Sequence, residues 1–229
     1  MRKLVIIPAY NEQGGIERTV RDICAQAPDF DYIIINDCST DDTLFVCRRN
    51  GFHVINLPIN LGIGGSVQTG YAYAFRNGYD IAVQFDGDGQ HNARYLHEMA
   101  EKLAEERLDM VIGSRYIKKE GFQSSGIRRV GIRYFTGMIK LVTGKKITDP
   151  TSGMRMAGRD VIAMYARNYP KDYPEPESVV AILKAGKKVG EVPVQMNARE
   201  EGVSSISPRK SVYYMIKVSL AILIAAVRR

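Results

Sequence analysis

Residues 81–90 read Ile81-Ala-Val-Gln-Phe-Asp86-Gly-Asp88-Gly-Gln90, a short apolar run followed directly by two carboxylates and two glycines. An apolar run of this length that ends in a polar turn is typical of a buried strand. In a parallel sheet, ligands bind outside the carboxyl ends of the strands. The stretch therefore predicts a strand of an α/β sheet and places a polar site at its end.

Similar strand patterns recur along the first half of the chain, separated by segments with the 3.6-residue apolar period of a helix. The predicted strands are Leu4–Ile7, Tyr32–Ile35, Val54–Leu57, Ile81–Phe85 and Met110–Ile112. The predicted helices are Ile16–Ala27, a helix capped by Ser39 or Thr40, Ser66–Asn77 and Tyr95–Glu106. Strand and helix alternate four times with short connections, which predicts a mostly parallel sheet with helices on both faces.

The pattern changes after Gly113, where residues 116–127 are polar and typical of a loop. The later predicted elements are helices over 128–143, 158–167 and 176–185 and a strand over Val189–Val194. The sequence contains no internal repeat and no low-complexity linker. We therefore expect one α/β domain over 1–206, followed by a C-terminal helix within 207–229.

Charge is unevenly distributed along the chain, whose net charge is +7. Residues 1–114 contain 10 Lys and Arg against 16 Asp and Glu, whereas residues 115–229 contain 22 against 9. A basic second half predicts an anionic partner, and nucleic acid, anionic lipid or a phosphorylated acceptor all fit the charge. The acidic first half, without helix-turn-helix or stacking-aromatic signatures, argues against nucleic acid.

The C-terminal stretch Val212–Val227 is apolar except for Lys217 and Ser219, and arginines and a lysine flank it. As a helix it would be about 24 Å long, shorter than the roughly 30 Å hydrocarbon core of a bilayer. We expect an interfacial helix, or one that docks on a partner or a second copy, with an ordinary buried helix as the alternative.

The N-terminus opens directly into a strand pattern without signal-peptide architecture, which favours a cytoplasmic location. The three cysteines, Cys24, Cys38 and Cys47, form no CxxC pair and lie near no histidine cluster. Buried thiols in a reducing compartment are therefore expected, rather than a zinc site or disulfides.

Asp86, Asp88 and Gln90 offer oxygen ligands directly after a predicted strand. Mg²⁺ and Mn²⁺ prefer oxygen ligands and usually keep coordination positions open for substrate phosphates. An acidic surface turn is the alternative interpretation, and the location at a strand end favours the metal.

Two further polar segments, Pro8-Ala-Tyr-Asn-Glu12 and Asn36-Asp37, follow the first two strands and fall on the same edge. Each alone fits turn and capping chemistry, whereas three such segments on one edge favour a nucleotide cleft. Gly62-Ile-Gly-Gly65 lacks the Lys-Ser/Thr ending of a Walker A loop and follows the third strand, so it is a poor dinucleotide fingerprint.

Seven segments over about residues 3–206 together resemble family 2 glycosyltransferases of the GT-A (Rossmann-like) fold. Within that family the chain is similar to the polyprenyl-phosphate, dolichol-phosphate mannosyltransferase-like branch. The segments are Pro8-Ala-Tyr-Asn-Glu12, Asn36-Asp-Cys-Ser-Thr-Asp-Asp42, Asn60-Leu-Gly-Ile-Gly-Gly65, Asp86-Gly-Asp-Gly-Gln-His91, Gly113-Ser-Arg115, Asp149-Pro-Thr-Ser-Gly-Met-Arg155 and Arg199-Glu-Glu-Gly-Val-Ser204.

The resemblance implies a role for each group of site residues. The expected nucleotide-binding residues are Pro8, Tyr10, Glu12, Asp37 and Gly62. Asp86, Asp88 and Gln90 would hold the metal that bridges the donor diphosphate. The expected acceptor-phosphate ligands are Arg115, Arg129 and Arg133, and Arg199 with Ser204 would close over the donor phosphates.

The implied reaction moves a sugar, with inversion, from a UDP- or GDP-sugar to a polyprenyl phosphate at the inner membrane face, for cell-surface polysaccharide or glycan synthesis. An anionic acceptor of this kind suits the arginines and needs no strong base. The alternative is transfer to a hydroxyl of a growing polysaccharide or glycolipid, which needs a carboxylate base. The candidate catalytic residues are Asp88, Arg115, Asp149, Glu175 and Glu177.

The sequence departs from the family pattern at two places. Tyr173-Pro-Glu-Pro-Glu177 stands where many relatives begin a helix with an acidic pair, so Glu175 and Glu177 both remain candidates to face the acceptor. The long hydrophobic C-terminal hairpin of many relatives is missing. We therefore expect a small membrane subunit or self-association to support contact with the membrane surface.

Overall fold

The computed structural model describes residues 1–118, 126–197 and 208–227 of the chain. Its strands are β1 Lys3–Ala9, β2 Asp31–Asn36, β3 Val54–Asn56, β4 Ile81–Gln84, β5 Met110–Ser114, β6 Arg155–Gly158 and β7 Val189–Pro193. They form one sheet in the order β3-β2-β1-β4-β6-β5-β7. Every neighbouring pair is parallel except that β6 runs antiparallel to β4 and β5. The α/β fold with a mostly parallel sheet is thus as predicted.

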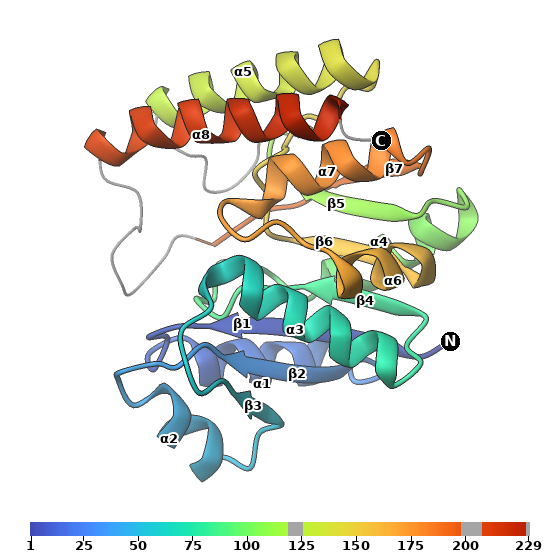
Figure 1. Ribbon diagram of the computed structural model, residues 1–229. Coiled ribbons are helices and arrows are strands. Elements are labelled where there is room, and N and C mark those ends of the chain that lie inside the picture. The colour runs from blue at the N-terminus through green and yellow to red at the C-terminus, as the bar shows by residue number, and fades with distance from the viewer. Residues whose placement is uncertain (119–125, 198–207, 228–229) are drawn as a thin grey trace.

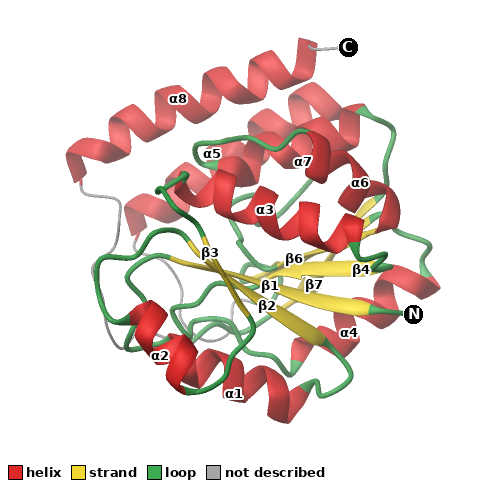
Figure 2. Ribbon diagram, turned by 60° about the horizontal axis from the view of Figure 1, so that its bottom comes forward, coloured by secondary structure: helices red, strands yellow, loops and turns green. Residues whose placement is uncertain are grey.

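Helices cover both faces of the sheet (Figures 1 and 2). They are α1 Ile16–Gln26, α2 Thr43–Arg49, α3 Gly62–Arg76, α4 Tyr95–Glu105, α5 Gly126–Thr143, α6 Arg159–Arg167, α7 Pro174–Lys184 and α8 Pro208–Val227. In Figure 2, α1, α2 and α4 lie below the sheet, whereas the other helices lie above it.

The two layers follow from the alternation of side chains along each strand. On β1, Leu4 and Ile6 join the core that contains α3, α6 and α7, whereas Val5 and Ile7 join the core that contains α1 and α4. All four side chains are fully buried. The central strands therefore read as continuous apolar runs, and this pattern made them predictable.

Local expectations were wrong at helices α2 and α3 and at Cys24, which is exposed rather than buried. Strand β6 was not predicted. Helix α3 begins at Gly62 rather than Ser66, so its first turn contains the glycines. A Cβ on Gly64 would clash with the Pro170 carbonyl oxygen, and this close approach requires glycine there. Helix α2 is preceded by Asp42, and neither Ser39 nor Thr40 caps it. Their hydroxyl groups instead bond to Asn36 and Asn11.

Helix α8 packs across α5 and α7, and Val218, Ile222 and Ala225 contribute to the core on that side (Figure 1). Within the described ranges, no helix is both long enough and apolar enough to cross a membrane.

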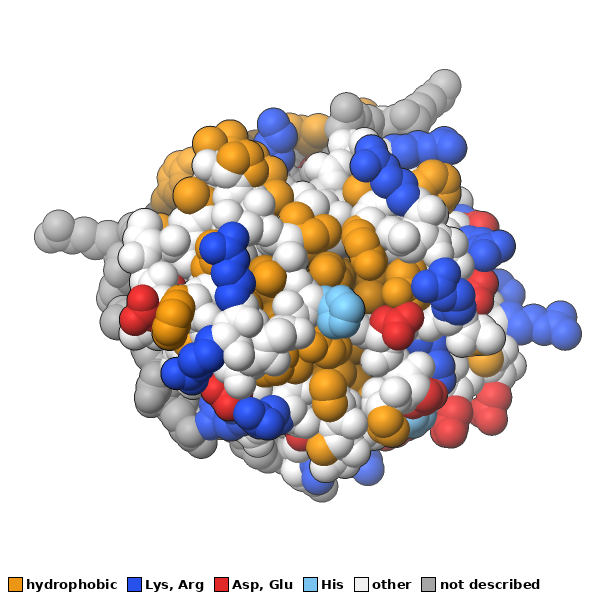
Figure 3. All heavy atoms as spheres, turned by 90° about the horizontal axis from the view of Figure 1, so that it is seen from below, with side chains coloured by type: hydrophobic (Ala, Val, Ile, Leu, Met, Phe, Trp, Pro, Cys, Tyr) orange, Lys and Arg blue, Asp and Glu red, His pale blue; other side chains and the backbone are white. Residues whose placement is uncertain are grey.

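The opposite end of the molecule, which carries α2 and β3, has a surface of mixed charge. Figure 3 shows Lys and Arg interspersed with Asp and Glu between small apolar patches on this face. The basic helix α5 lies at the other end, beside α8 (Figure 1).

Candidate active site

A cavity of about 480 Å³ opens at the carboxyl ends of β1, β2 and β4, the edge that the sequence predicts. Eight of the predicted site residues line it: Pro8, Tyr10, Glu12, Asp37, Gly62, Asp86, Asp88 and Glu175. They come from five separate segments of the chain, and the sheet brings these segments together.

The two aspartates follow β4 in a tight turn that Gly89, with a φ of 72°, makes possible. The Asp86 amide donates to Nδ1 of the buried His91 at 3.0 Å, and the Gln90 amide donates to the Asp88 carboxylate at 3.0 Å. Asp88 is 8% exposed, whereas the Asp86 side chain is 37% exposed. Both carboxylates are therefore held at the cavity while part of their surface stays open.

This donor set fits a magnesium or manganese ion that takes its remaining ligands from substrate and water. Two carboxylates one residue apart line the same cavity, and no group of three His, Cys, Asp or Glu suited to a metal gathers among the described residues. Gln90, the third expected ligand, does not line the cavity, and its side-chain amide lies 3.5 Å from the Asn197 carbonyl oxygen.

The charge of the cavity wall is strongly negative. Glu12, Asp37, Asp86, Asp88 and Glu175 are among its lining residues, and no Lys or Arg of the described ranges is. An anion that enters this cavity meets repulsion from several sides unless a cation enters with it.

Burial shifts the pKa of two of these carboxyl groups. Desolvation raises the pKa of Asp37, although the Leu61 amide, which donates at 2.7 Å, opposes the rise. Desolvation also raises the pKa of Glu175, and the positive charge of Arg155 opposes that rise. Both groups therefore take up a proton more readily than an exposed carboxylate does.

Arg115 and Asp149 form a bidentate ion pair beside the cavity but do not line it. The Arg115 guanidinium donates to the two Asp149 oxygens at 2.7 and 2.8 Å, and to Thr151 Oγ1 at 3.1 Å. Burial lowers the pKa of Arg115, but its hydrogen bonds with Asp149 and the negative charges of Asp149 and Asp86 together outweigh this effect and raise the pKa. Asp149 is fully buried, so the structure places it as the partner of Arg115 rather than as an open base.

The remaining predicted residues lie away from the cavity or outside the described ranges. Arg129 and Arg133 are exposed one turn apart on α5, and Glu177 lies on α7 without lining the cavity. Arg199 and Ser204 fall in 198–207, outside the described residues.

Sequence reasoning gave no role to several residues at this site. Asn60, Ser66 and Tyr173 line the cavity, and a Cβ on Gly153 would lie 2.6 Å from the Asp86 carboxylate. Asn60 and Gly153 belong to the quoted segments, so their position in those segments was an available signal. Tyr173 begins the quoted segment Tyr173-Pro-Glu-Pro-Glu177, and the structure gives it a φ of 50° at the start of α7.

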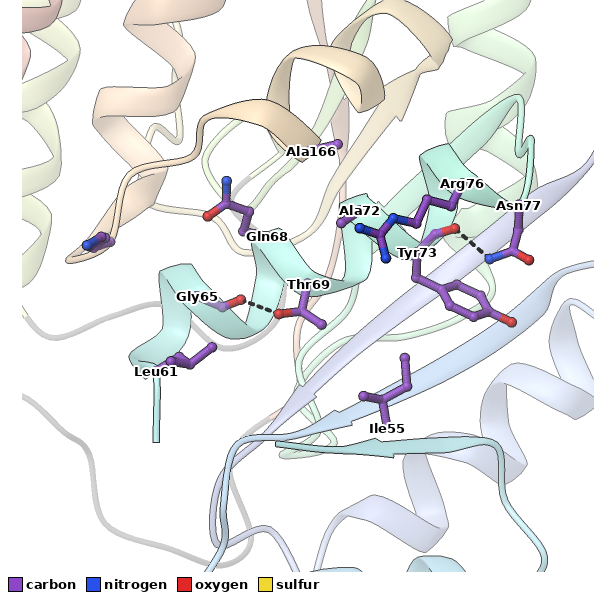
Figure 4. Close-up of a pocket in the computed structure, with 11 residues that line it drawn as sticks. Ile55, Leu61, Gly65, Gln68, Thr69, Ala72, Tyr73, Arg76, Asn77 and Ala166 are labelled. Carbon is purple, nitrogen blue, oxygen red and sulfur yellow. Dashed lines mark hydrogen bonds between the residues drawn. The ribbon is translucent and has the colours of Figure 1, made fainter. Parts of the chain in front are cut away.

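A second, larger hollow of about 630 Å³ lies along the outer side of α3 (Figure 4). Its lining includes no Asp or Glu of the described residues, and the side chains of Thr69 and Asn77 bond to carbonyl groups of their own helix. The described lining of the hollow therefore offers no carboxylate to a hard cation, and the acidic cavity is the better candidate site.

Comparisons with known proteins agree with this geometry. A family model described as glycosyl transferase family 2 matches residues 4–165. The chain is 27% identical to the undecaprenyl-phosphate mannosyltransferase of Micrococcus luteus, over 90% of this chain and 88% of that protein. It is 29% identical to the UDP-N-acetylglucosamine–dolichyl-phosphate N-acetylglucosaminyltransferase of Methanococcus voltae, over 83% of this chain and 84% of that protein.

The fold is also similar to solved structures. Glucosyl-3-phosphoglycerate synthase from Mycobacterium tuberculosis, crystallised with Mn²⁺, uridine diphosphate and glucosyl-3-phosphoglycerate, aligns with a TM-score of 0.75 at 19% identity. The alignment covers 98% of this chain and 79% of that one. The matched family region spans β1 to α6 and includes the two aspartates and most of the cavity wall. The expected resemblance is confirmed: the chain belongs to glycosyl transferase family 2 and is a glycosyltransferase.

Proposed function

We propose that this enzyme transfers a sugar from a UDP- or GDP-sugar to a polyprenyl phosphate at the inner face of the cell membrane, for cell-surface polysaccharide or glycan synthesis. The names of the Micrococcus and Methanococcus relatives support a polyprenyl or dolichyl phosphate acceptor. The Mn²⁺ and uridine diphosphate in the similar crystal structure support a metal-assisted nucleotide-sugar donor.

The observation that carries the proposal is the acidic cavity, which no Lys or Arg of the part described by the structure lines. Two like charges about 4 Å apart repel by about 4 kcal/mol at an effective dielectric constant near 20. A diphosphate therefore enters favourably only together with a cation. When bound by Asp86 and Asp88, Mg²⁺ or Mn²⁺ would offset the charge that builds on the departing nucleoside diphosphate.

The nucleoside would bind on the β1–β2 side of the cavity. Tyr10 is about half exposed there, and Asp37 accepts a hydrogen bond from the Leu61 amide in the turn before α3. Pro8, Glu12 and Gly62 complete this wall, and Gly62 has a positive φ that suits glycine. Arg199 and Ser204 are proposed to close over the donor phosphates.

The acceptor phosphate would approach from the α5 side. Asp149 holds the Arg115 guanidinium in one orientation, and Arg129 with Arg133 adds exposed cations. Arginine suits such sites because its planar fork matches phosphate oxygens. A phosphate oxygen is already anionic near neutral pH, so the transfer needs positioning more than a base.

The outer faces of α5 and α8 suit a membrane surface. Val130, Leu141, Ile216, Leu220 and Ile224 are large apolar side chains that are exposed on these helices. Arg129, Arg133 and Lys140 lie among them on α5. Apolar side chains beside cations are typical of helices that lie at the surface of an anionic bilayer. A small membrane subunit or a second copy is the alternative occupant of this surface.

One observation favours a second acceptor class. Glu175 lines the cavity and its raised pKa brings it nearer to the range of a general base, which a sugar hydroxyl acceptor would require. In that case the product would be an extended polysaccharide or glycolipid.

The test is a panel of labelled UDP- and GDP-sugars with Mn²⁺ or Mg²⁺ and polyprenyl phosphate, followed by extraction into organic solvent. The proposal expects label in an acid-labile lipid fraction and none when a chelator is added. Label found only on an added glycan would favour the hydroxyl acceptor, and full transfer in excess chelator would contradict the metal role.

A further inference from the structure

Arg155 is the largest side chain that is fully buried in the described part of the protein, with 1% of its surface exposed. It is the first residue of β6, the antiparallel strand that the sequence did not predict. No carboxylate of the described residues lies within salt-bridge distance of its guanidinium. A buried cation of this kind costs several kcal/mol of stability unless its N–H groups find hydrogen-bond acceptors.

Hydrogen bonds take up four of the five N–H donors of the guanidinium. Nε donates to the Ser152 carbonyl at 2.7 Å, and Nη2 donates to the Pro150 carbonyl at 2.7 Å. Nη1 donates to the Glu175 carbonyl at 2.6 Å and to Ser178 Oγ at 2.8 Å. The first pair of acceptors lies in the turn before β6, and the second pair lies in the first turns of α7. One side chain therefore joins two segments that are about 25 residues apart.

Both segments form part of the candidate active site. The turn over 150–153 begins beside Asp149, which holds Arg115, and ends at Gly153, which packs against the Asp86 carboxylate. The first turn of α7 carries Glu175 into the cavity. A shift of either segment would change the position of Glu175 relative to Asp86.

We propose that Arg155 is a positioning residue, which fixes the first turn of α7 against the turn over 150–153 and so sets the width of the cavity between Glu175 and Asp86. This inference rests on the proposed function. A lysine in its place keeps the charge but has one nitrogen, so it cannot donate to both segments in the geometry of the guanidinium fork.

The experiment compares Arg155→Lys with the wild-type enzyme and with Tyr165→Phe. The control removes a buried hydroxyl group that bonds to the Ser178 carbonyl at 3.3 Å, but it leaves all four Arg155 contacts in place. Three quantities are measured: thermal unfolding, hydrogen exchange of peptides that cover 149–154 and 173–179, and kcat and KM for the donor. Arg155→Met serves as a second variant, in which the charge is also lost.

In Arg155→Lys we expect cooperative unfolding, faster exchange in both peptides together, and a fall of about 100-fold in kcat per folded molecule, the cost of a misplacement of about 1 Å. We expect Arg155→Met to lose more activity than Arg155→Lys, and Tyr165→Phe to keep the wild-type kcat and KM within twofold. A lower melting temperature with unchanged kcat and KM, or faster exchange in only one peptide, would overturn the proposal.

The exchange measurement does not depend on the identity of the donor or the acceptor. If the wild-type enzyme turns over none of the nucleotide sugars, the proposed function fails, and the coupled exchange of the two peptides still decides whether Arg155 joins them.

Discussion

Two regions of the molecule differ in charge, in burial and in the elements that carry their side chains. One is the cavity edge at β1, β2 and β4, and the other is the outer layer made by α5 and α8. The cavity edge is acidic and partly enclosed, and most of its residues follow a buried strand directly. The outer layer is basic and apolar on its exposed side. This difference supports the proposal that the cavity edge holds a metal-bound diphosphate and that the outer layer faces an anionic lipid acceptor.

The largest expected effect is at the cavity edge. Asp88→Ala should reduce transfer by about 10³-fold or more, because it removes a proposed metal ligand, while the melting temperature stays near that of the wild type. Glu98→Ala, on the exposed side of α4, is the matched control and should keep full activity. Transfer by Asp88→Ala at more than a tenth of the wild-type rate would contradict the proposal that the cavity edge, and not the outer layer, binds the metal and the donor.

A smaller effect is expected from Gly153→Ala. The new Cβ would meet the movable Asp86 carboxylate at 2.6 Å, so the chain should fold while Asp86 shifts from its position. We expect a loss of about 100-fold in kcat, as for a misplacement of about 1 Å. Gly137→Ala on α5, where a Cβ meets open space, is the control. Equal activity of both variants with the wild type would argue that the position of Asp86 is unimportant.

On the outer layer, Arg129→Ala or Arg133→Ala should raise the KM for polyprenyl phosphate about tenfold and leave the donor KM unchanged, because a hydrogen bond to a charged group contributes about 1.5 kcal/mol. Steady-state kinetics with each substrate varied in turn would measure this. Arg76→Ala, on α3 away from this layer, is the control. If the donor and acceptor KM values rise equally, the proposed separation of the two regions is wrong.

The smallest expected effect concerns stability. Burial raises the pKa of Asp37 in the folded state, so the folded protein favours the protonated carboxyl group. The resulting stabilisation is fully present below the unfolded-state pKa and is lost as pH rises through the folded-state pKa. Asp37→Asn mimics the protonated form and should be more stable than the wild type at pH 7, with the difference shrinking as pH falls toward 3. Urea unfolding at both pH values tests this, and a difference that grows in acid would contradict it.

The same contrast explains which strands and site residues can be predicted from the sequence alone. The strands β1, β2 and β4 are runs of apolar residues buried on both faces, so local pattern identifies them and the polar residues that follow them. Strand β6 is four residues long, begins with the buried Arg155 and pairs with strands distant in sequence. Local pattern does not detect such a strand, because tertiary contacts determine it.

The pairing of Arg115 with Asp149 illustrates the same limit. The two residues are 34 positions apart, and the sequence marks each as a candidate without indicating that one holds the other. The entry of Tyr173 into the cavity depends on a left-handed backbone conformation at the start of α7, which a tyrosine rarely adopts. Tertiary packing decides both features.

The central claim is that the acidic cavity binds a nucleoside diphosphate only together with a divalent cation. Isothermal titration of UDP and GDP into the full chain, with Mn²⁺ and with chelator, tests this claim directly. The account predicts binding of at least one nucleotide with Mn²⁺, no measurable binding in chelator, and loss of the Mn²⁺-dependent binding in Asp88→Asn. Equal affinity with and without the cation, or unchanged binding by Asp88→Asn, would contradict it.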